Sequence, residues 1–478
     1  MFGKTKAVVE EDVAVREKKQ FIKMTQTSIP RLIVTLGIPT TLSMMVTSLY
    51  NLVDMYFVSG LGGEATGAVS VVMSLMSIIQ AIGFTFGMGS GSIVSKRLGE
   101  RDREGADEVA SSAFFVAGAI GVLIFLFGSM FLKPLMQVLG APSEEGVAVT
   151  TLQYAMEYSQ YILLAAPFMC MSFVMNNVLR AEGKAVLSMI GLIIGAVINV
   201  VLDPILIYGA NMKMAGAAIA TCISQCASFL VLLFLFLSRK SVVRMRFRKI
   251  SRKFAVYKDV ITTGFPSFCR QVLASLCTVL LTWAVNPYEG GLEALGVVQK
   301  IFMLAFSISL GIGQGYQPVL GYNYSAKRFD RVRSAYLFTL GFSTVLMCVF
   351  AIVCAVFTPQ IMQAFNQSPE ATEIGTLTLR MQCLTMPLLP LNFMAGLTYQ
   401  VVGNKAIAAL LSVSRQGLFY IPAVLILPRV LFLFGVQCCQ AVSDLLAAIF
   451  AVPFTILFFN TLKKEMEKEK NSQAGQIE

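Results

Sequence analysis

The sequence predicts an all-α membrane protein with twelve transmembrane helices in two pseudo-symmetric six-helix bundles. Three observations support this fold class: apolar runs of about 20 residues recur along the chain, basic loops alternate with loops that hold few basic residues, and the two halves share short motifs. The composition agrees, since the residues AVILMFWYC make up 56% of the 478 positions and the charged residues only 14%. A soluble chain of this length would carry far more charge on its surface.

The first bundle is predicted over residues 32–238. A charged segment, 1–31, precedes it, and because this segment is not apolar we expect no cleavable signal; the first span itself directs insertion. Six apolar runs then follow, each long enough to cross a bilayer core. Their approximate limits are 32–58, 66–93, 109–132, 152–174, 186–208 and 214–237.

The second bundle is predicted over residues 259–460, and a polar tail, 461–478, follows it. The even number of spans places both ends of the chain on the same side of the membrane. The six runs of this half are approximately 260–285, 295–316, 336–357, 377–399, 406–427 and 433–459.

A basic loop, 239–258, separates the two halves and is expected to act as a hinge between them. It holds nine of the 38 Lys and Arg residues. Alternate loops together hold 20 of these basic residues, whereas the intervening loops hold four. This asymmetry predicts that the basic loops and both termini face the cytoplasm, in the inner membrane of a prokaryote. It also explains the net charge of +11 without nucleic acid as a partner.

Short motifs recur between the halves in the same order. Residues 64–69 match 293–298 at an offset of 229, Gly87 and Gly89 match Gly313 and Gly315 at 226, and Gly183 matches Gly403 at 220. These matches support a duplication. Because each half has an even number of spans, the two copies enter the membrane in the same orientation. A cavity between them that opens alternately to each side is the expected mechanism.

Two acidic residues lie inside predicted spans of the first half, where an Asp costs about 3 kcal/mol at a helix centre. Asp54 in the first span and Asp203 in the fifth are predicted at similar depth. Asn199 lies one turn before Asp203, and Thr221 in the sixth span reaches the same level. These four oxygen-bearing side chains predict a cation-coupling site, which could bind a proton or hold Na⁺ through oxygen ligands.

The alternative is that Asp54 ends its helix near the interface and Asp203 forms only local hydrogen bonds. Pro204, directly after Asp203, is expected to bend the helix there. At the repeat-related positions of the second half, 281–283 and 423–424, no carboxylate occurs. Ion coupling is therefore assigned to the first half.

The second half has its own embedded charges, Arg270, Arg415 and Asp444. Arg270 and Arg415 are predicted at nearly equal depth, so either could pair with Asp444. Such a group could neutralise itself and fix helix packing, or it could contact substrate together with Gln271. The sequence leaves both possibilities open.

Catalysis and a resident cofactor are not expected. The chain has no His, its ten Cys lack metal-ligand spacing, and HExxH and GxSxG motifs are missing. The Cys residues suit small buried thiols in packed helices. The 25 Met and 35 Phe include flexible and aromatic side chains that can accept apolar cations of varied shape.

The sequence resembles the multidrug and toxic compound extrusion (MATE) transporter family, with some similarity to its firmicute-type multidrug subgroup. The matching segments are Pro39 with 50–54, 97–100, 199–204, 215–221, 264–266, 317–323, and 414–416 with Pro422. The resemblance implies a V-shaped pair of six-helix bundles and the export of amphipathic cations in exchange for H⁺ or Na⁺. It also implies that Asp54, Asn199, Asp203 and Thr221 take part in cation coupling.

Cationic drugs or metabolites and the lipid bilayer are the partners that this resemblance implies, with the chain acting as a monomer. A flippase for lipid-linked oligosaccharides or polysaccharides, from the same superfamily, is the alternative function. It would require a wide cationic cavity for a pyrophosphate head group, which two embedded Arg residues do not establish.

Overall fold

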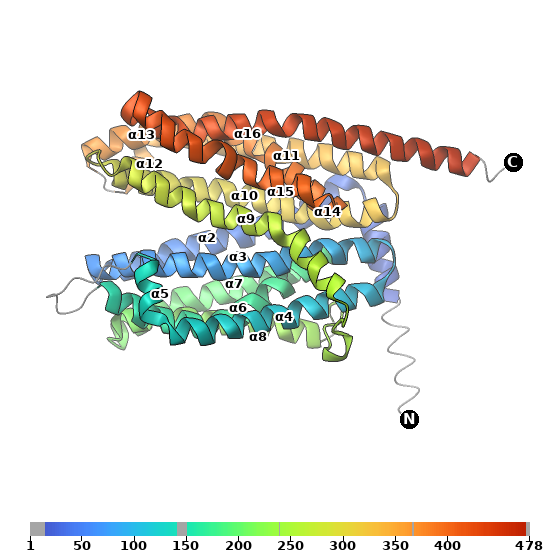
Figure 1. The fold of residues 1–478 in the computed structure, drawn as a ribbon, viewed down its shortest axis with the longest axis horizontal. Coiled ribbons are helices and arrows are strands. Elements are labelled where there is room, and N and C mark those ends of the chain that lie inside the picture. Colours follow the sequence, from blue (N-terminus) through green and yellow to red (C-terminus); the bar gives the residue numbers. More distant parts are fainter. Residues whose placement is uncertain (1–14, 141–150, 239, 366–367, 475–478) are drawn as a thin grey trace. The chain divides into compact units, whose positions relative to one another are not determined.

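The structure is a computed structural model that describes residues 15–140, 151–238, 240–365 and 368–474 (Figure 1). These residues form helices and no strand, which confirms the predicted all-α class. The first half contains α2 (Ile29–Ser59), α3 (Gly63–Gly99), α4 (Arg103–Met130), α5 (Leu132–Val138), α6 (Thr151–Ala181), α7 (Ala185–Pro204), the π-helix η1 (Ile205–Gly209) and α8 (Lys213–Leu237).

The second half begins after a single turn of 3-10 helix, η2 (Phe247–Lys249), in the basic loop. Its elements are α9 (Phe254–Val285), α10 (Gly291–Ser325), α11 (Phe329–Val356), α12 (Thr358–Ala364), α13 (Pro369–Thr385), the 3-10 turn η3 (Met386–Leu388), α14 (Leu389–Val402), α15 (Lys405–Val413), the π-helix η4 (Ser414–Tyr420) and α16 (Ile421–Ala474).

Ten helical stretches of the described residues are long and apolar enough to cross a membrane. Nine of them correspond one for one to the first nine predicted spans. The tenth predicted span, 377–399, is divided between α13 and α14 by η3, where Pro387 and Pro390 each lack a backbone N–H donor. The eleventh and twelfth spans run together in one stretch, broken at Phe432 by its backbone angles of φ 53° and ψ −132°. This break lies in the predicted gap, so the twelve-span bundle is consistent with the structure.

The chain forms two compact units. Unit 1 comprises Met1–Phe21 and Leu42–Gln271, and unit 2 comprises Ile22–Thr41 and Val272–Glu478. In unit 1, α6 lies centrally and contacts α3, α4, α7 and α8. In unit 2, α10 contacts α11, α13 and α14, and α16 packs against α13, α14 and η4.

The boundaries between the units fall inside α2 and α9, so the first part of each helix packs with the opposite half of the sequence. In unit 2, a Cβ on Gly315 of α10 would come within 2.5 Å of the Cα of Gly37. In unit 1, a Cβ on Gly264 of α9 would come within 1.8 Å of the backbone oxygen of Thr85. Only glycine permits backbones to cross this closely. Gly37 and Gly264 each precede a proline by two residues, which adds a further matched motif to the predicted duplication.

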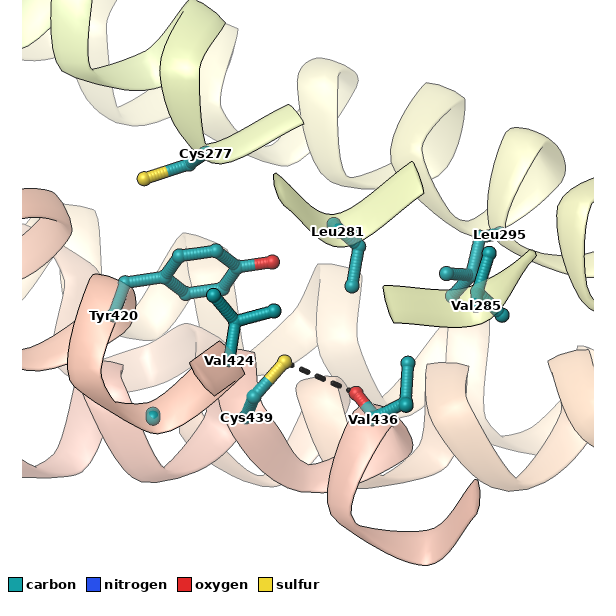
Figure 2. Packing of buried hydrophobic residues seen from close by; sticks show 9 residues of the cluster. Cys277, Leu281, Val285, Leu295, Tyr420, Val424, Val436 and Cys439 are labelled. Atoms are coloured by element: carbon teal, nitrogen blue, oxygen red, sulfur yellow. Dashed lines mark hydrogen bonds between the residues drawn. The ribbon is translucent and has the colours of Figure 1, made fainter. Parts of the chain in front are cut away.

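The core of unit 2 joins both sides of the break at Phe432. Figure 2 shows Cys277, Leu281 and Val285 of α9 facing Tyr420, Val424, Val436 and Cys439 across one apolar cluster. The thiol of Cys439 donates to the backbone oxygen of Val436 at 3.0 Å. Cys277 and Cys439 are buried, as expected of small thiols in packed helices.

Candidate functional site

Four helices of unit 1 bring the predicted coupling residues together. On α7, the Asn199 amide donates to Oδ1 of Asp203 at 3.2 Å, which fits their spacing of one helical turn. The same amide donates to the hydroxyl of Thr221 on α8 at 3.3 Å. The hydroxyl of Tyr158 on α6 lies 3.2 Å from that of Thr221 and donates to Oδ2 of Asp54 on α2 at 3.3 Å. A continuous hydrogen-bonded chain therefore runs from Asp203 to Asp54.

The two carboxyl groups are also close enough to interact electrostatically with each other. Two ionised carboxylates repel each other and become attractive only when a proton or another cation is shared between them. Asp203 is fully buried.

The site holds more hydrogen-bond acceptors than donors. Oδ1 of Asp54, Oδ1 of Asn199 and Oδ2 of Asp203 are buried oxygens without a hydrogen-bond donor. Among the described residues, no Lys or Arg forms an ion pair with either carboxylate. Buried acceptors of this kind need a partner, and carboxylate, amide and hydroxyl oxygens are the ligands that hard cations prefer. The residues therefore fit a bound proton or Na⁺.

A small pocket adjoins this group on the side of Asp54. Asp54, Tyr158 and Thr221 form its polar wall, whereas Asp203 does not line it. The other lining residues include Tyr50, Asn51, Met73 and Met76. An ion in the pocket would therefore contact Asp54 but not Asp203.

The backbone changes form directly after the site, at Pro204, where a bend was predicted. The α-helix α7 ends at Pro204 and continues as the π-helix η1, in which the N–H of Ala210 donates to the oxygen of Ile205 at 2.8 Å. Proline cannot continue the regular hydrogen-bonding pattern, and the wider π turn accommodates it. Tyr208 of η1 then donates to the backbone oxygen of Phe57 at 2.6 Å, which ties this segment to the end of α2 beyond Asp54.

Tyr158, which links the two halves of the network, was not among the residues predicted from the sequence. A signal for it existed. The fourth and sixth spans run in the same direction, and Tyr158 lies seven residues after Thr151, as Thr221 lies eight after Lys213. The depth comparison that selected Thr221 would therefore also have selected Tyr158.

The embedded charges predicted for the second half are divided between the two units. Arg415 of η4 and Asp444 of α16 form an ion pair in unit 2, with Nε and Oδ1 at 2.7 Å. Arg270 and Gln271 belong to unit 1, where the guanidinium of Arg270 donates to the hydroxyl of Ser267 at 3.4 Å. Of the two pairings left open, the structure contains the one between Arg415 and Asp444.

The Arg415–Asp444 pair is enclosed by other side chains. Gln440 donates to Oδ1 of Asp444 at 2.9 Å, and the guanidinium of Arg415 lies 5.1 and 5.8 Å from the ring centroids of Phe302 and Phe306. These contacts compensate part of the cost of burying both charges, since Nη2 of Arg415 and Oδ2 of Asp444 have no hydrogen-bond partner. A role of this pair in substrate contact stays a prediction.

Comparison with known proteins identifies the relatives of this chain. The MatE family profile matches residues 39–205 and 266–426. The chain is similar to the multidrug export protein MepA of Staphylococcus saprophyticus, at 23% identity over 430 residues that cover 89% of this chain and 93% of that protein. It is also similar to MepA of Staphylococcus aureus, at 25% identity over 434 residues with coverage of 89% and 93%.

Solved structures share the fold over nearly the whole chain. An outward-facing multidrug resistance MATE family transporter of the MOP superfamily superposes with a TM-score of 0.87 at 27% identity, covering 93% of this chain and 98% of that one. A MOP superfamily transporter from Pyrococcus furiosus, for which a binding pocket of reverse polarity suggests a different function, gives a TM-score of 0.85 at 27% identity, with coverage of 92% and 98%.

Proposed function

The chain belongs to the MatE family, and from this premise we propose that it is a secondary active multidrug efflux transporter that exports amphipathic organic cations by exchange with H⁺ or Na⁺. Family membership and the ten membrane-length helices support a multi-pass membrane transport protein. Its similarity to multidrug export proteins over 89% of its length supports drugs as the exported class. We also propose that the exchanged ion is H⁺ or Na⁺ and that the cavity opens alternately to each side of the membrane.

The shortage of positive charge around Asp54 and Asp203 carries this proposal. Three buried oxygens of the site lack a donor, and a single bound cation could meet all three needs. When the cation leaves, the two carboxylates repel each other until another cation binds. Leaving this site without a cation therefore costs free energy. For this reason the site favours the replacement of one cation by another over the release of a cation without replacement.

Coupling follows if the drug and the ion use the same negative charge. A cationic drug that presents its charged group to Asp54 at the small pocket and an ion between Asp54 and Asp203 would both neutralise Asp54, so their binding is mutually unfavourable. Met73, Met76 and Tyr50 line the pocket with flexible or aromatic surface that suits apolar cations of varied shape. The substrate class and the coupling site are therefore proposed to meet at Asp54.

The cellular setting completes the proposal. We place the protein in the cytoplasmic membrane of a bacterium, with both termini in the cytoplasm. It acts as a monomer without a resident cofactor. Its partners are cationic drugs or metabolites and the bilayer, and it binds no nucleic acid. The flippase alternative gains no support from Arg415, because the charge of Arg415 is compensated by Asp444.

Transport into proteoliposomes tests the proposal directly. The purified chain is reconstituted, and uptake of a fluorescent organic cation is followed under a pH gradient alone, a sodium gradient alone, or neither. We expect uptake under at least one gradient and none without a gradient. Equal uptake under all three conditions would contradict exchange, and no uptake of several organic cations under any gradient would contradict the substrate class.

A further inference from the structure

The loop between the two bundles, expected to be a hinge, is attached to unit 1. We call residues 240–253 the basic strap. It contains seven Lys or Arg residues and no Asp or Glu. It connects the end of α8 at Leu237 with the start of α9 at Phe254, so it lies where two membrane-length helices end. Figure 1 shows it beside the beginning of α4.

Buried carboxylates hold the backbone of the basic strap in place. Glu182, which is fully buried, accepts hydrogen bonds from the N–H groups of Val242 and Val243 at 2.9 Å each. Asp107, 2% exposed, accepts from the N–H of Arg244 at 2.7 Å and from the ammonium group of Lys249 at 2.9 Å.

Hydroxyl groups of α4 add two further bonds. The Ser111 hydroxyl accepts from the N–H of Arg246 at 3.0 Å, and the Ser112 hydroxyl from the N–H of Ser251 at 2.8 Å. With its backbone fixed at five N–H groups and the side chain of Lys249 bound to Asp107, the strap presents its remaining side chains in a defined arrangement.

The exposed side chains of the strap include both arginines and phenylalanine rings. Arg246, Arg248 and Arg252 are exposed, and in the described part of the chain no acidic side chain pairs with them. Phe247, between two of them, is 75% exposed, although its ring meets the edge of Phe115 at 5.3 Å between centroids. Phe254, at the end of the strap, is 78% exposed.

We propose that the basic strap is a binding surface for the phosphate headgroups of anionic phospholipids. Guanidinium groups recognise phosphate oxygens with paired N–H donors, and exposed aromatic rings settle at the boundary between headgroups and acyl chains. The strap offers both at the level where its flanking helices leave the apolar layer. Because its backbone is bonded to Asp107 and Glu182, a lipid bound there holds the ends of α4 and α6 of unit 1.

The test measures lipid binding rather than transport, so it does not depend on the proposed function. The purified full chain in neutral detergent is titrated with phosphatidylglycerol or phosphatidylcholine, and bound lipid is counted by native mass spectrometry. The test variant is Arg246→Ala/Arg248→Ala/Arg252→Ala. The matched control is Lys463→Ala/Lys464→Ala/Lys468→Ala, which removes the same charge from exposed positions of the tail.

We expect wild type and control to prefer phosphatidylglycerol, and the strap variant to lose affinity for it by at least about fivefold. Equal phosphatidylglycerol affinity in the two triple variants would overturn the proposal. So would full displacement of the lipid by inorganic phosphate, since the site would then take a soluble anion. If the triple variant does not purify, Arg246→Gln and Arg248→Gln, each at an exposed side chain, provide the same comparison.

Discussion

In unit 1 two carboxylates lie together without a basic partner, whereas in unit 2 a single carboxylate is held by an arginine. Asp54 and Asp203 are surrounded by the hydroxyls of Tyr158 and Thr221 and the amide of Asn199, all of them neutral. Asp444 lies 2.7 Å from Arg415 and accepts a further bond from Gln440. Both groups are inside helical bundles, where an uncompensated charge is costly.

Under the proposed function, this difference assigns the exchange of a cation to the site in unit 1. An internal arginine is permanently charged and tethered, so the charge of Asp444 is balanced without any ligand, although Nη2 of Arg415 and Oδ2 of Asp444 are buried without a hydrogen-bond partner. The carboxylates of unit 1 must obtain their positive charge from outside the protein. A transporter needs such a site, because a cation that arrives from one side of the membrane can leave to the other.

Removing the acidic charge of unit 1 has the largest expected effect. Asp54→Asn and Asp203→Asn keep the shape of the side chain but remove the charge that binds the cation. We expect resistance to organic cations and gradient-driven uptake to fall to the level of cells or liposomes without the protein, at unchanged protein abundance. The measurement is drug susceptibility together with proteoliposome uptake.

A matched neutralisation controls for charge loss in general. Glu467→Gln changes an exposed residue in the terminal part of α16 and should leave resistance at the wild-type level. Full resistance in both aspartate variants would remove the coupling hypothesis, and loss of resistance in the control would show that the assay reports on stability.

Breaking the ion pair of unit 2 should affect folding before it affects transport. Asp444→Ala leaves the guanidinium of Arg415 buried without its carboxylate, which costs about 3–5 kcal/mol of stability. We expect a lower melting temperature and lower abundance, with ion selectivity unchanged in the protein that remains. Thermal unfolding in detergent and uptake per folded molecule measure the two effects separately.

The double variant Arg415→Met/Asp444→Leu distinguishes a packing role of the ion pair from a role in transport. Well-packed apolar side chains often replace a buried ion pair without loss of stability, so the melting temperature should recover. Recovery of both stability and transport would assign the pair to packing. Recovery of stability alone, with substrate uptake still lost, would contradict a purely structural role.

The sequence predicted the arrangement of the polar residues of unit 1 better than the charge network of unit 2, for a geometric reason. Asn199 and Asp203 share a helical face through their spacing of one turn, so one of their contacts followed from periodicity alone. Depth along a span then added Asp54 and Thr221. Depth gives only one coordinate, however, and the direction in which a side chain points around its helix is set by packing. Arg270 and Arg415 therefore looked equivalent, although they belong to different units.

Departures from regular helix were the other features that the sequence did not fully predict. Pro204 predicted a bend after Asp203, and the break near Phe432 lay in a predicted gap. No comparable signal marks the π-helix at Ser414–Tyr420, which contains Arg415. Its extra residue per turn is stabilised by tertiary contacts, including the bond from the Ser443 hydroxyl to the backbone oxygen of Arg415. Contacts between residues so far apart in the chain cannot be derived from local propensity.

The smallest expected effect concerns Tyr158, the residue that connects the two ends of the unit 1 network. Tyr158→Phe removes the hydroxyl that donates to Asp54, while Asp54 and Asp203 keep their charges. A carboxylate that loses a hydrogen bond to its charged form holds a cation more tightly, so affinity for the coupling cation should rise by about three- to tenfold. Release then slows, and maximal uptake should fall while the half-saturating ion concentration decreases.

Tyr161→Phe, three residues later on α6, is the control, because the described structure gives its hydroxyl no partner. If maximal uptake and the half-saturating ion concentration both decrease for Tyr158→Phe but not for Tyr161→Phe, the neutral donors of unit 1 weaken cation binding enough for the ion to leave. Unchanged constants would mean that the two carboxylates set the affinity by themselves. The difference between the units would then depend on the missing arginine and not on the hydroxyl and amide groups that replace it.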